Sequence, residues 1–350
     1  MKTRNSSIEL LRTFAILGVV VLHYNGNVAL NLVTDGSIQQ SVLLAFESLF
    51  LCAVNTFILI SGYFLSNSTQ RHWVKVVQLL CQVMVLGVVR YGFSVLLAGG
   101  GFSLSSLVSS IIPNNWFVTL YLTLYIVSPD LNLLRERLNK KQMGILLIIA
   151  LFLFSVWPTV LDAIHHIMGQ FFNGMYPLSM GGNMGGYTIV QFGLMYLIGA
   201  YLRRFGDHIR IRSHWVALIF FGGVGTLTLW QMVEPTSARS YSNPLIILMA
   251  VCAFLLFSRI QIQSKVINRI AQGAFACYIL HDVFLPYVGI EQVIGGNPLL
   301  LMGHIMVCAL GIYLISFGVD FLYGLVSRPI LAWVGKRLAR WDRYISPSKE

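Results

Sequence analysis

Two polar residues in one apolar stretch of the sequence have the types and the spacing to do chemistry. Arg12 and His23 both fall in the first hydrophobic segment, eleven residues apart. Eleven residues of α-helix turn through about 1100°, so the two side chains share one face and lie roughly 16 Å apart. A cation at the centre of a membrane helix costs roughly 2.5–3.5 kcal/mol on insertion scales, which favours a function for the pair. The spacing indicates a long thin ligand that is held at one end and reacts at the other.

Each of these two residues also has a purely structural interpretation. A neutral histidine is suited to act as a general base, but in lipid it is equally suited to an interhelical hydrogen bond. Arg12 would be a fixed cation for a phosphate or a pyrophosphate. Glu9, three residues earlier, instead offers Arg12 a local ion pair.

The elements that must position these residues are membrane helices. The chain is 56% hydrophobic and 11% charged, with a mean hydropathy of +0.73, which excludes an ordinary soluble domain. We predict an all-α, polytopic transmembrane bundle of about ten spans. The spans lie near 8–28, 42–65, 73–97, 115–134, 142–160, 185–202, 214–232, 243–259, 272–293 and 299–323. On this interpretation residues 1–327 form one integral membrane domain and residues 328–350 form a basic cytoplasmic tail.

The positions of the basic residues give the predicted bundle an orientation. The formal net charge is +11, and most Lys and Arg residues lie on alternate loops or in the C-terminal tail. By the positive-inside rule these loops are cytoplasmic, so both termini are predicted to be cytoplasmic and the number of spans to be even. The same charges favour contact with anionic membrane lipids. Because the charge excess follows the topology, nucleic acid is not an expected partner.

Several common sources of chemistry are missing from the sequence. The five cysteines all fall in apolar segments, without a CxxC motif or a Cys/His cluster. We therefore expect no disulfide framework and no metal site. The sequence also contains no GxSxG elbow, no Walker A loop and no HExxH motif, which argues against the enzyme classes that use them.

The end of the second predicted span supplies small and basic residues on the cytoplasmic side. Ser61 and Gly62 permit close approach of a ligand or of another helix. Just beyond them, Arg71 and Lys75 lie one helical turn apart and would form a phosphate clamp at the inner surface. Helix packing and membrane topology are the competing explanations for these two pairs.

Two further pairs of polar residues lie within predicted spans. Arg90 and Glu47 fall at similar depths in the third and second spans, which favours a buried ion pair between them. His281 and Asp282 are neighbours in the ninth span, where adjacent side chains point about 100° apart. Asp282 is therefore not expected to orient His281, which is instead the candidate partner for His23 across the bundle.

Taken in order, these motifs resemble the membrane acyltransferase 3 family of bacterial cell-envelope acylators. Each motif by itself is a weak signal, but the motifs together, in this order, are specific. The matching pieces are Arg12-x10-His23, Asn55-Thr-Phe-Ile-Leu-Ile-Ser61-Gly62-Tyr63, the basic Arg71 and Lys75, Trp116-Phe-Val-Thr-Leu-Tyr121 with its continuation to Asn132, and Tyr278-Ile-Leu-His281-Asp282.

The resemblance implies an enzyme that moves an acyl group, usually acetyl, to a hydroxyl of an envelope glycan or a lipid-linked saccharide. The donor substrate would be cytoplasmic acetyl-CoA or another acyl-CoA, with no bound cofactor. The implied location is the bacterial plasma membrane, in which the protein is multi-pass. Coenzyme A carries its phosphates and its thioester at opposite ends of an extended arm, which agrees independently with the spacing of Arg12 and His23.

The resemblance also implies roles for individual residues. His23 and His281 would be catalytic. The residues expected to bind acyl-CoA are Arg12, Arg71, Lys75, Ser61 and Gly62, and those expected to line the acceptor pocket are Trp116, Tyr121 and Asn55. We expect His23 to deprotonate the acceptor hydroxyl for direct attack on the thioester. A covalent acetyl-histidine intermediate is the alternative.

Two other classes of protein share the predicted spans. A transporter or flippase of a glycan or lipid-linked intermediate would keep intramembrane charges without acyl transfer. It would be expected to show related halves around a midplane site, and no internal repeat is evident. A glycan polymerase or ligase would be expected to have a large basic outer loop, whereas Arg239 is the only cation that we predict on an outer loop. Acyl transfer therefore ranks first.

Overall fold

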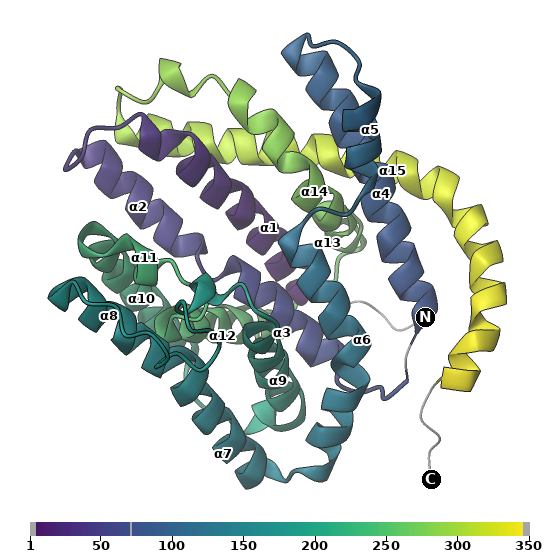
Figure 1. Cartoon of the computed structure of the whole chain (residues 1–350), viewed down its shortest axis with the longest axis horizontal. Coiled ribbons are helices and arrows are strands. Elements are labelled where there is room, and N and C mark those ends of the chain that lie inside the picture. The colour runs from purple at the N-terminus through teal and green to yellow at the C-terminus, as the bar shows by residue number, and fades with distance from the viewer. Residues whose placement is uncertain (1–4, 71, 346–350) are drawn as a thin grey trace. The chain divides into compact units, whose positions relative to one another are not determined.

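The fold is built from helices joined by turns and loops (Figure 1). The computed structural model describes residues 5–70 and 72–345, with His208 and residues 328–345 described by their backbone alone, and this part of the chain contains no β-strand. Its helices are α1 (Ser6–Asn27), α2 (Ile38–Phe50), α3 (Ala53–Leu65), α4 (Trp73–Ala98), α5 (Leu104–Ile111), α6 (Trp116–Arg137), α7 (Lys140–Leu151), α8 (Trp157–Met168), α9 (Ile189–Phe205), α10 (Ser213–Val233), α11 (Pro235–Ala238), α12 (Pro244–Ser258), α13 (Lys265–Ile270), α14 (Ala274–Phe284) and α15 (Pro298–Ile345). The predicted all-α class is confirmed.

Seven helical stretches of the described chain are long and apolar enough to cross a membrane. They are Ser6–Asn31, Ile38–Leu65, Trp73–Ala98, Leu104–Arg137, Lys140–Met168, Ser213–Val233 and Pro298–Ser327. Three other predicted spans correspond to shorter helices, which are α9 with 17 residues, α12 with 15 and α14 with 11. A membrane-spanning helix usually needs about 20 residues. The membrane class is therefore supported, while the count of ten spans and the cytoplasmic termini stay predictions.

The ends of several helices carry local signals that the sequence contains. Asn5 caps α1, where its side-chain oxygen accepts from the backbone N–H groups of Ser7 and Ile8. Asn139 and Gln142 form a reciprocal capping box at the start of α7. These contacts satisfy backbone donors that have no partner inside the first turn of a helix.

The chain divides into two compact units. The first unit comprises Met1–Leu43, Gln70–Ile126 and Gln263–Glu350, and the second comprises Leu44–Thr69 and Val127–Ile262. In the first unit, α14 packs against α1, α4 and the long helix α15, which is yellow in Figure 1. In the second unit, α3 packs against α9 and α12, and α10 packs against α12. The two predicted catalytic histidines both belong to the first unit.

Candidate active site

His23 and His281 meet where α1 packs against α14. Nδ1 of His23 lies 2.5 Å from Nε2 of His281, and the two ring centroids are 4.6 Å apart. His281 is buried, whereas His23 is half-buried. The partner predicted for His23 from the sequence is therefore present in the structure.

The hydrogen bonds around His281 determine which ring nitrogens carry protons in the neutral pair. Nδ1 of His281 lies 3.1 Å from the carbonyl oxygen of Cys277 and 2.9 Å from that of Tyr278. A carbonyl oxygen only accepts, so this Nδ1 must carry the proton. Nε2 of a neutral His281 is then an acceptor, and His23 must donate to it through Nδ1. Nε2 of His23 is left with an unshared electron pair, which a general base requires.

Asp282 takes part in a different interaction, although it is the next residue after His281. Its carboxylate accepts from Arg90 at 2.6 Å, and both side chains are partly exposed. The ion pair expected between Arg90 and Glu47 is wrong, because Glu47 pairs with Arg239 of its own unit at 3.2 Å. Depth in a span can be read from the sequence, but the partner also depends on how each helix is rotated about its axis.

A row of aromatic rings extends from His281 to the start of α6. The ring of Tyr278 lies 6.1 Å from that of His281 and 4.9 Å from that of Phe117, between centroids. Phe117 in turn stacks on Tyr121 at 5.9 Å and contacts Trp116 at 5.8 Å. Two of the residues predicted to line the acceptor pocket, Trp116 and Tyr121, are thus connected to the histidine pair through neighbouring rings.

Two residues without a role predicted from the sequence hold this region together. The hydroxyl of Tyr278 donates to the side-chain oxygen of Asn115 at 2.9 Å, which ties α14 to the start of α6. Tyr278 precedes His281 by three residues and therefore shares its helix face. That spacing is the signal by which Tyr278 could have been found, whereas Asn115 stands in a loop without a comparable pattern.

The residues predicted to hold acyl-CoA fall into different surroundings. Arg12 donates to Glu9 at 2.8 Å, and its side chain is 31% exposed. A guanidinium has five N–H groups, so one such pair leaves donors for an anion. Lys75 is exposed in the first turn of α4. Arg71 lies outside the described residues.

The remaining two residues predicted for acyl-CoA, Ser61 and Gly62, belong to the second unit. A Cβ atom at Gly62 would lie 2.1 Å from the backbone oxygen of Tyr196 in α9. Gly62 therefore permits close packing of α3 against α9, the helix contact that small residues usually serve in membranes. The hydroxyl of Ser61 donates to the backbone oxygen of Phe57 at 2.9 Å. A contact of these two residues with acyl-CoA stays a prediction.

Asn55, predicted to line the acceptor pocket, is buried in the second unit. Its amide nitrogen donates to the backbone oxygen of Tyr241 at 2.8 Å, and its oxygen accepts from Gln191 at 3.2 Å. Gln191 also donates to the same oxygen of Tyr241 at 2.8 Å. These bonds hold the segment before α12 against α3 and α9. The structure thus gives Asn55 a positioning contact, and its role toward an acceptor stays a prediction.

Groups of His, Cys, Asp and Glu residues are the usual ligands of metal ions in proteins, and the structure shows where these residues lie in the described part of the chain. Within it, no group of three or more His, Cys, Asp or Glu residues is placed to hold a metal ion. All five cysteines are free thiols.

A helical membrane fold in which two histidines meet between packed helices is consistent with an acyl-transfer enzyme, and comparison with known families agrees. The family model described as an acyltransferase domain matches residues 5–333. The chain therefore belongs to the acyltransferase 3 family, as the sequence motifs predict. No curated protein and no solved structure matches the chain. Family membership favours a membrane acyltransferase over the transporter alternative.

Proposed function

We propose that the protein transfers an acetyl or other short acyl group from cytoplasmic acyl-CoA to a hydroxyl of a cell-envelope glycan or lipid-linked saccharide. The observation that carries the proposal is the hydrogen bond between His23 and His281 in a chain of the acyltransferase 3 family. The proposed location is the bacterial plasma membrane, with the donor entering from the cytoplasm.

In this proposal the donor lies along α1. Arg12, with Arg71 and Lys75, holds the phosphates of the coenzyme at the inner surface. The pantetheine arm extends toward His23, which lies roughly 16 Å farther along the helix. The partial exposure of Arg12 supports this arrangement, because a fully buried cation would be closed to a ligand.

The chemical step needs one base and no covalent intermediate. Nε2 of His23 takes the proton of the acceptor hydroxyl while the hydroxyl oxygen attacks the thioester carbonyl carbon. The new C–O bond forms, the C–S bond breaks, and the coenzyme leaves as a thiolate. The proton on His23 then passes to this sulfur, which yields the ester and free CoA.

His281 would assist this step without touching the substrate. It accepts from Nδ1–H of His23 and so keeps Nε2 available as the base. When His23 becomes protonated, the same hydrogen bond then has a charged donor and is stronger than before. In this proposal His281 is therefore a positioning residue that stabilises the imidazolium of His23.

The proposal is tested by incubating purified full-length protein with radiolabelled acetyl-CoA and a panel of envelope glycans and lipid-linked saccharides. We expect label on one acceptor class and release of free CoA in equal amount. Release of CoA without an acceptor would support use of the donor and leave the acceptor class to be identified. Absence of both transfer and release, in protein that remains folded, would overturn the proposal.

The same incubation without acceptor separates direct transfer from a covalent intermediate. If transfer is direct, no radiolabelled acetyl group should remain on the protein when it is denatured rapidly without acid. Label on a peptide that contains His23 would instead establish acetyl-histidine.

A further inference from the structure

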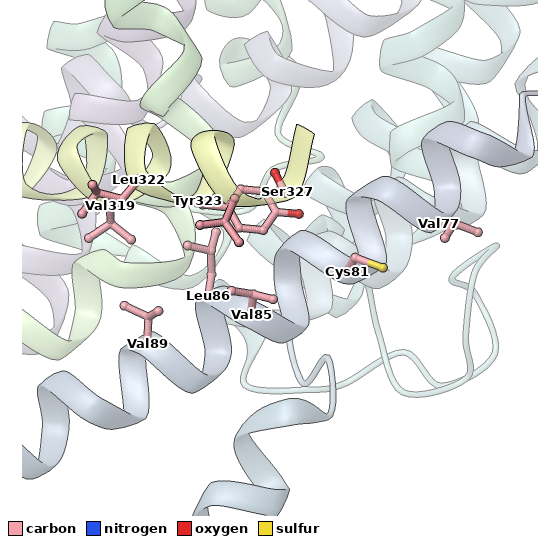
Figure 2. A pocket seen from close by; sticks show the side chains of 10 residues that line it. Val77, Cys81, Val85, Leu86, Val89, Val319, Leu322, Tyr323 and Ser327 are labelled. Atoms are coloured by element: carbon pink, nitrogen blue, oxygen red, sulfur yellow. The ribbon is translucent and has the colours of Figure 1, made fainter. Parts of the chain in front are cut away.

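An apolar groove lies between α4 and α15 in the first unit, and neither histidine of the pair lines it. It has a volume of about 520 Å³ and is lined almost entirely by carbon atoms. Figure 2 shows that Val77, Val85 and Val89 line it from α4, with Val319 and Leu322 from α15 on the opposite side. The groove is therefore a gap between two membrane helices whose surfaces suit a hydrocarbon chain.

The length and depth of the groove match one leaflet of a bilayer. Val77 and Val89 are twelve residues apart on α4, which corresponds to roughly 18 Å. Half of a bilayer hydrocarbon core is roughly 15 Å thick. With the topology predicted from charge, α4 begins at the cytoplasmic surface, so the groove extends from the inner surface toward the middle of the membrane. An acyl chain of the inner leaflet would run in this direction, and the part of the groove from Cys81 to Val89 would hold about 12 Å of it.

A small polar pocket adjoins the groove. Its volume is about 180 Å³, and it shares Tyr323 and Ser327 with the groove. Arg269 and Asp320 both line it. The guanidinium of Arg269 lies over the ring of Phe321, 5.1 Å from its centroid. The pocket thus places a cation and an anion beside an apolar channel.

The two charges select a head group of a particular kind. A lipid phosphate would bind to the guanidinium of Arg269. A head-group ammonium would donate to the carboxylate of Asp320, which already accepts from Gln82 at 2.9 Å. An ammonium has three donors and no acceptor, so it suits an acidic neighbour. A phosphate followed by a primary ammonium is the head group of phosphatidylethanolamine.

We propose that this groove and pocket bind one phosphatidylethanolamine molecule of the inner leaflet. Its phosphate lies on Arg269, its ammonium lies on Asp320, and one acyl chain lies between α4 and α15. The proposal goes beyond acyl transfer and does not depend on it, because none of these residues takes part in the proposed reaction.

Native mass spectrometry of delipidated full-length protein, titrated with lipids of identical chains, tests the head group. Phosphatidylethanolamine is compared with phosphatidylcholine, whose methylated ammonium cannot donate. We expect one bound phosphatidylethanolamine with affinity about fivefold higher, the factor for one charged contact at a membrane surface. Equal affinity for the two lipids would overturn the assignment of the head group, and no retained lipid would overturn the site.

Variants of the two charged residues locate the head group. Arg269→Gln should weaken both lipids about fivefold, and Asp320→Asn should remove the preference for phosphatidylethanolamine. Lys265→Gln is the matched control, because Lys265 lies exposed on the same helix α13 and does not line the pocket. A loss of binding in Lys265→Gln equal to that in Arg269→Gln would show a nonspecific charge effect and overturn the proposal.

A second pair of variants tests the groove and does not rely on charge. Val85→Trp fills the groove and should reduce binding of both lipids, whereas Val88→Trp should not. Both valines are exposed on α4, with exposed fractions of 44% and 37%, and only Val85 lines the groove. Thermal unfolding of each variant checks that it is folded. Unchanged lipid binding in folded Val85→Trp would overturn the placement of the acyl chain.

Discussion

The two units of the molecule use polar groups inside helices in different ways. In the first unit, the neutral pairing of His23 with His281 leaves a ring nitrogen of His23 with an unshared electron pair. In the second unit, the side-chain nitrogen of Asn55 donates to the backbone oxygen of Tyr241, and its side-chain oxygen accepts from Gln191. An unsatisfied polar group in a membrane is costly. A polar side chain that can still form a hydrogen bond is therefore a candidate for chemistry. A polar side chain whose hydrogen bonds are all made within the protein is a candidate for holding helices together.

The same contrast applies to the small residue in the predicted acyl-CoA motif. Gly62 lies against the backbone of α9, and Gly199 of α9 lies equally close to the backbone oxygen of Leu59 in α3. This reciprocal contact sets how closely the two helices approach. We therefore expect changes in the first unit to alter turnover with little effect on stability, and changes at this glycine contact to do the reverse.

The largest effect is expected at the base itself. His23→Gln should lower kcat/KM about 10²–10⁴-fold, the usual contribution of general acid–base catalysis. The thermal unfolding temperature should stay close to that of the unchanged protein, because His23 is only half-buried. The measurement is acetyl transfer to whichever acceptor the native protein uses, with unfolding followed in parallel.

A matched control for His23 exists on α15. His304 accepts or donates a 2.8 Å hydrogen bond with the hydroxyl of Tyr24, the residue next to His23. His304→Gln should retain turnover because it lies outside the proposed reaction. Near-normal turnover in His23→Gln would show that His23 is not the base. It would then contradict the proposed difference between the polar groups of the two units.

The second effect is expected at the partner histidine and distinguishes positioning from packing. His281→Leu should lower kcat by about 10²-fold, the lower end of the usual contribution of general acid–base catalysis, because no acceptor then holds Nδ1–H of His23 and keeps Nε2 as the basic nitrogen. His281→Gln should retain more activity, since its amide oxygen can accept from Nδ1–H of His23. If both variants lose activity equally while remaining folded, the tautomer argument fails.

The third effect concerns stability in the second unit. Gly62→Ala should lower the free energy of unfolding by about 1–3 kcal/mol, because the added methyl group overpacks the α3–α9 contact. Gly193→Ala on α9 is the control, since a Cβ atom there meets no heavy atom within 4 Å. Thermal unfolding in detergent measures both. If the Gly62→Ala protein has native stability but fails to bind acyl-CoA, Gly62 contributes to donor binding rather than to helix packing.

The smallest effect is expected at the proposed phosphate contact. Arg12→Gln should weaken acyl-CoA binding about tenfold, which is the loss of one charge-assisted contact. Glu9→Gln should leave affinity unchanged or raise it, because it releases Arg12 from its ion pair. Equilibrium binding of a nonhydrolysable acyl-CoA analogue measures both. Equal affinity of Arg12→Gln and the native protein would leave Arg12 as a partner of Glu9 alone.

Much of the first unit could be predicted from the sequence. Hydropathy indicates the membrane class, and helical periodicity places Arg12 and His23 on one face of α1. The pairing of His23 with His281 could be predicted because few polar residues occur in the spans and those few tend to meet. These inferences depend on the local composition and spacing of residues, which can be read directly from the order of the sequence.

The partners of the charged residues could not be predicted in the same way. Depth in the membrane predicts a pair of Glu47 with Arg90, but Glu47 pairs with Arg239 and Arg90 pairs with Asp282. The rotation of a helix about its axis is decided by packing along its whole length, which no single pair of residues encodes. Gly62 was ambiguous for the same reason, because a small residue permits approach without specifying what approaches.

The sequence by itself determined an all-helical membrane protein of the acyltransferase 3 family, with a cation and a histidine spaced along one helix. Hydrophobic length and residue order are sufficient for those conclusions. Only the tertiary structure decided that His281 bonds to the backbone through Nδ1, and therefore that Nε2 of His23 is the basic nitrogen. It also decided that α4 and α15 leave an apolar groove beside Arg269 and Asp320. The physical reason is that hydrogen-bond direction and the gaps between helices arise from packing in three dimensions.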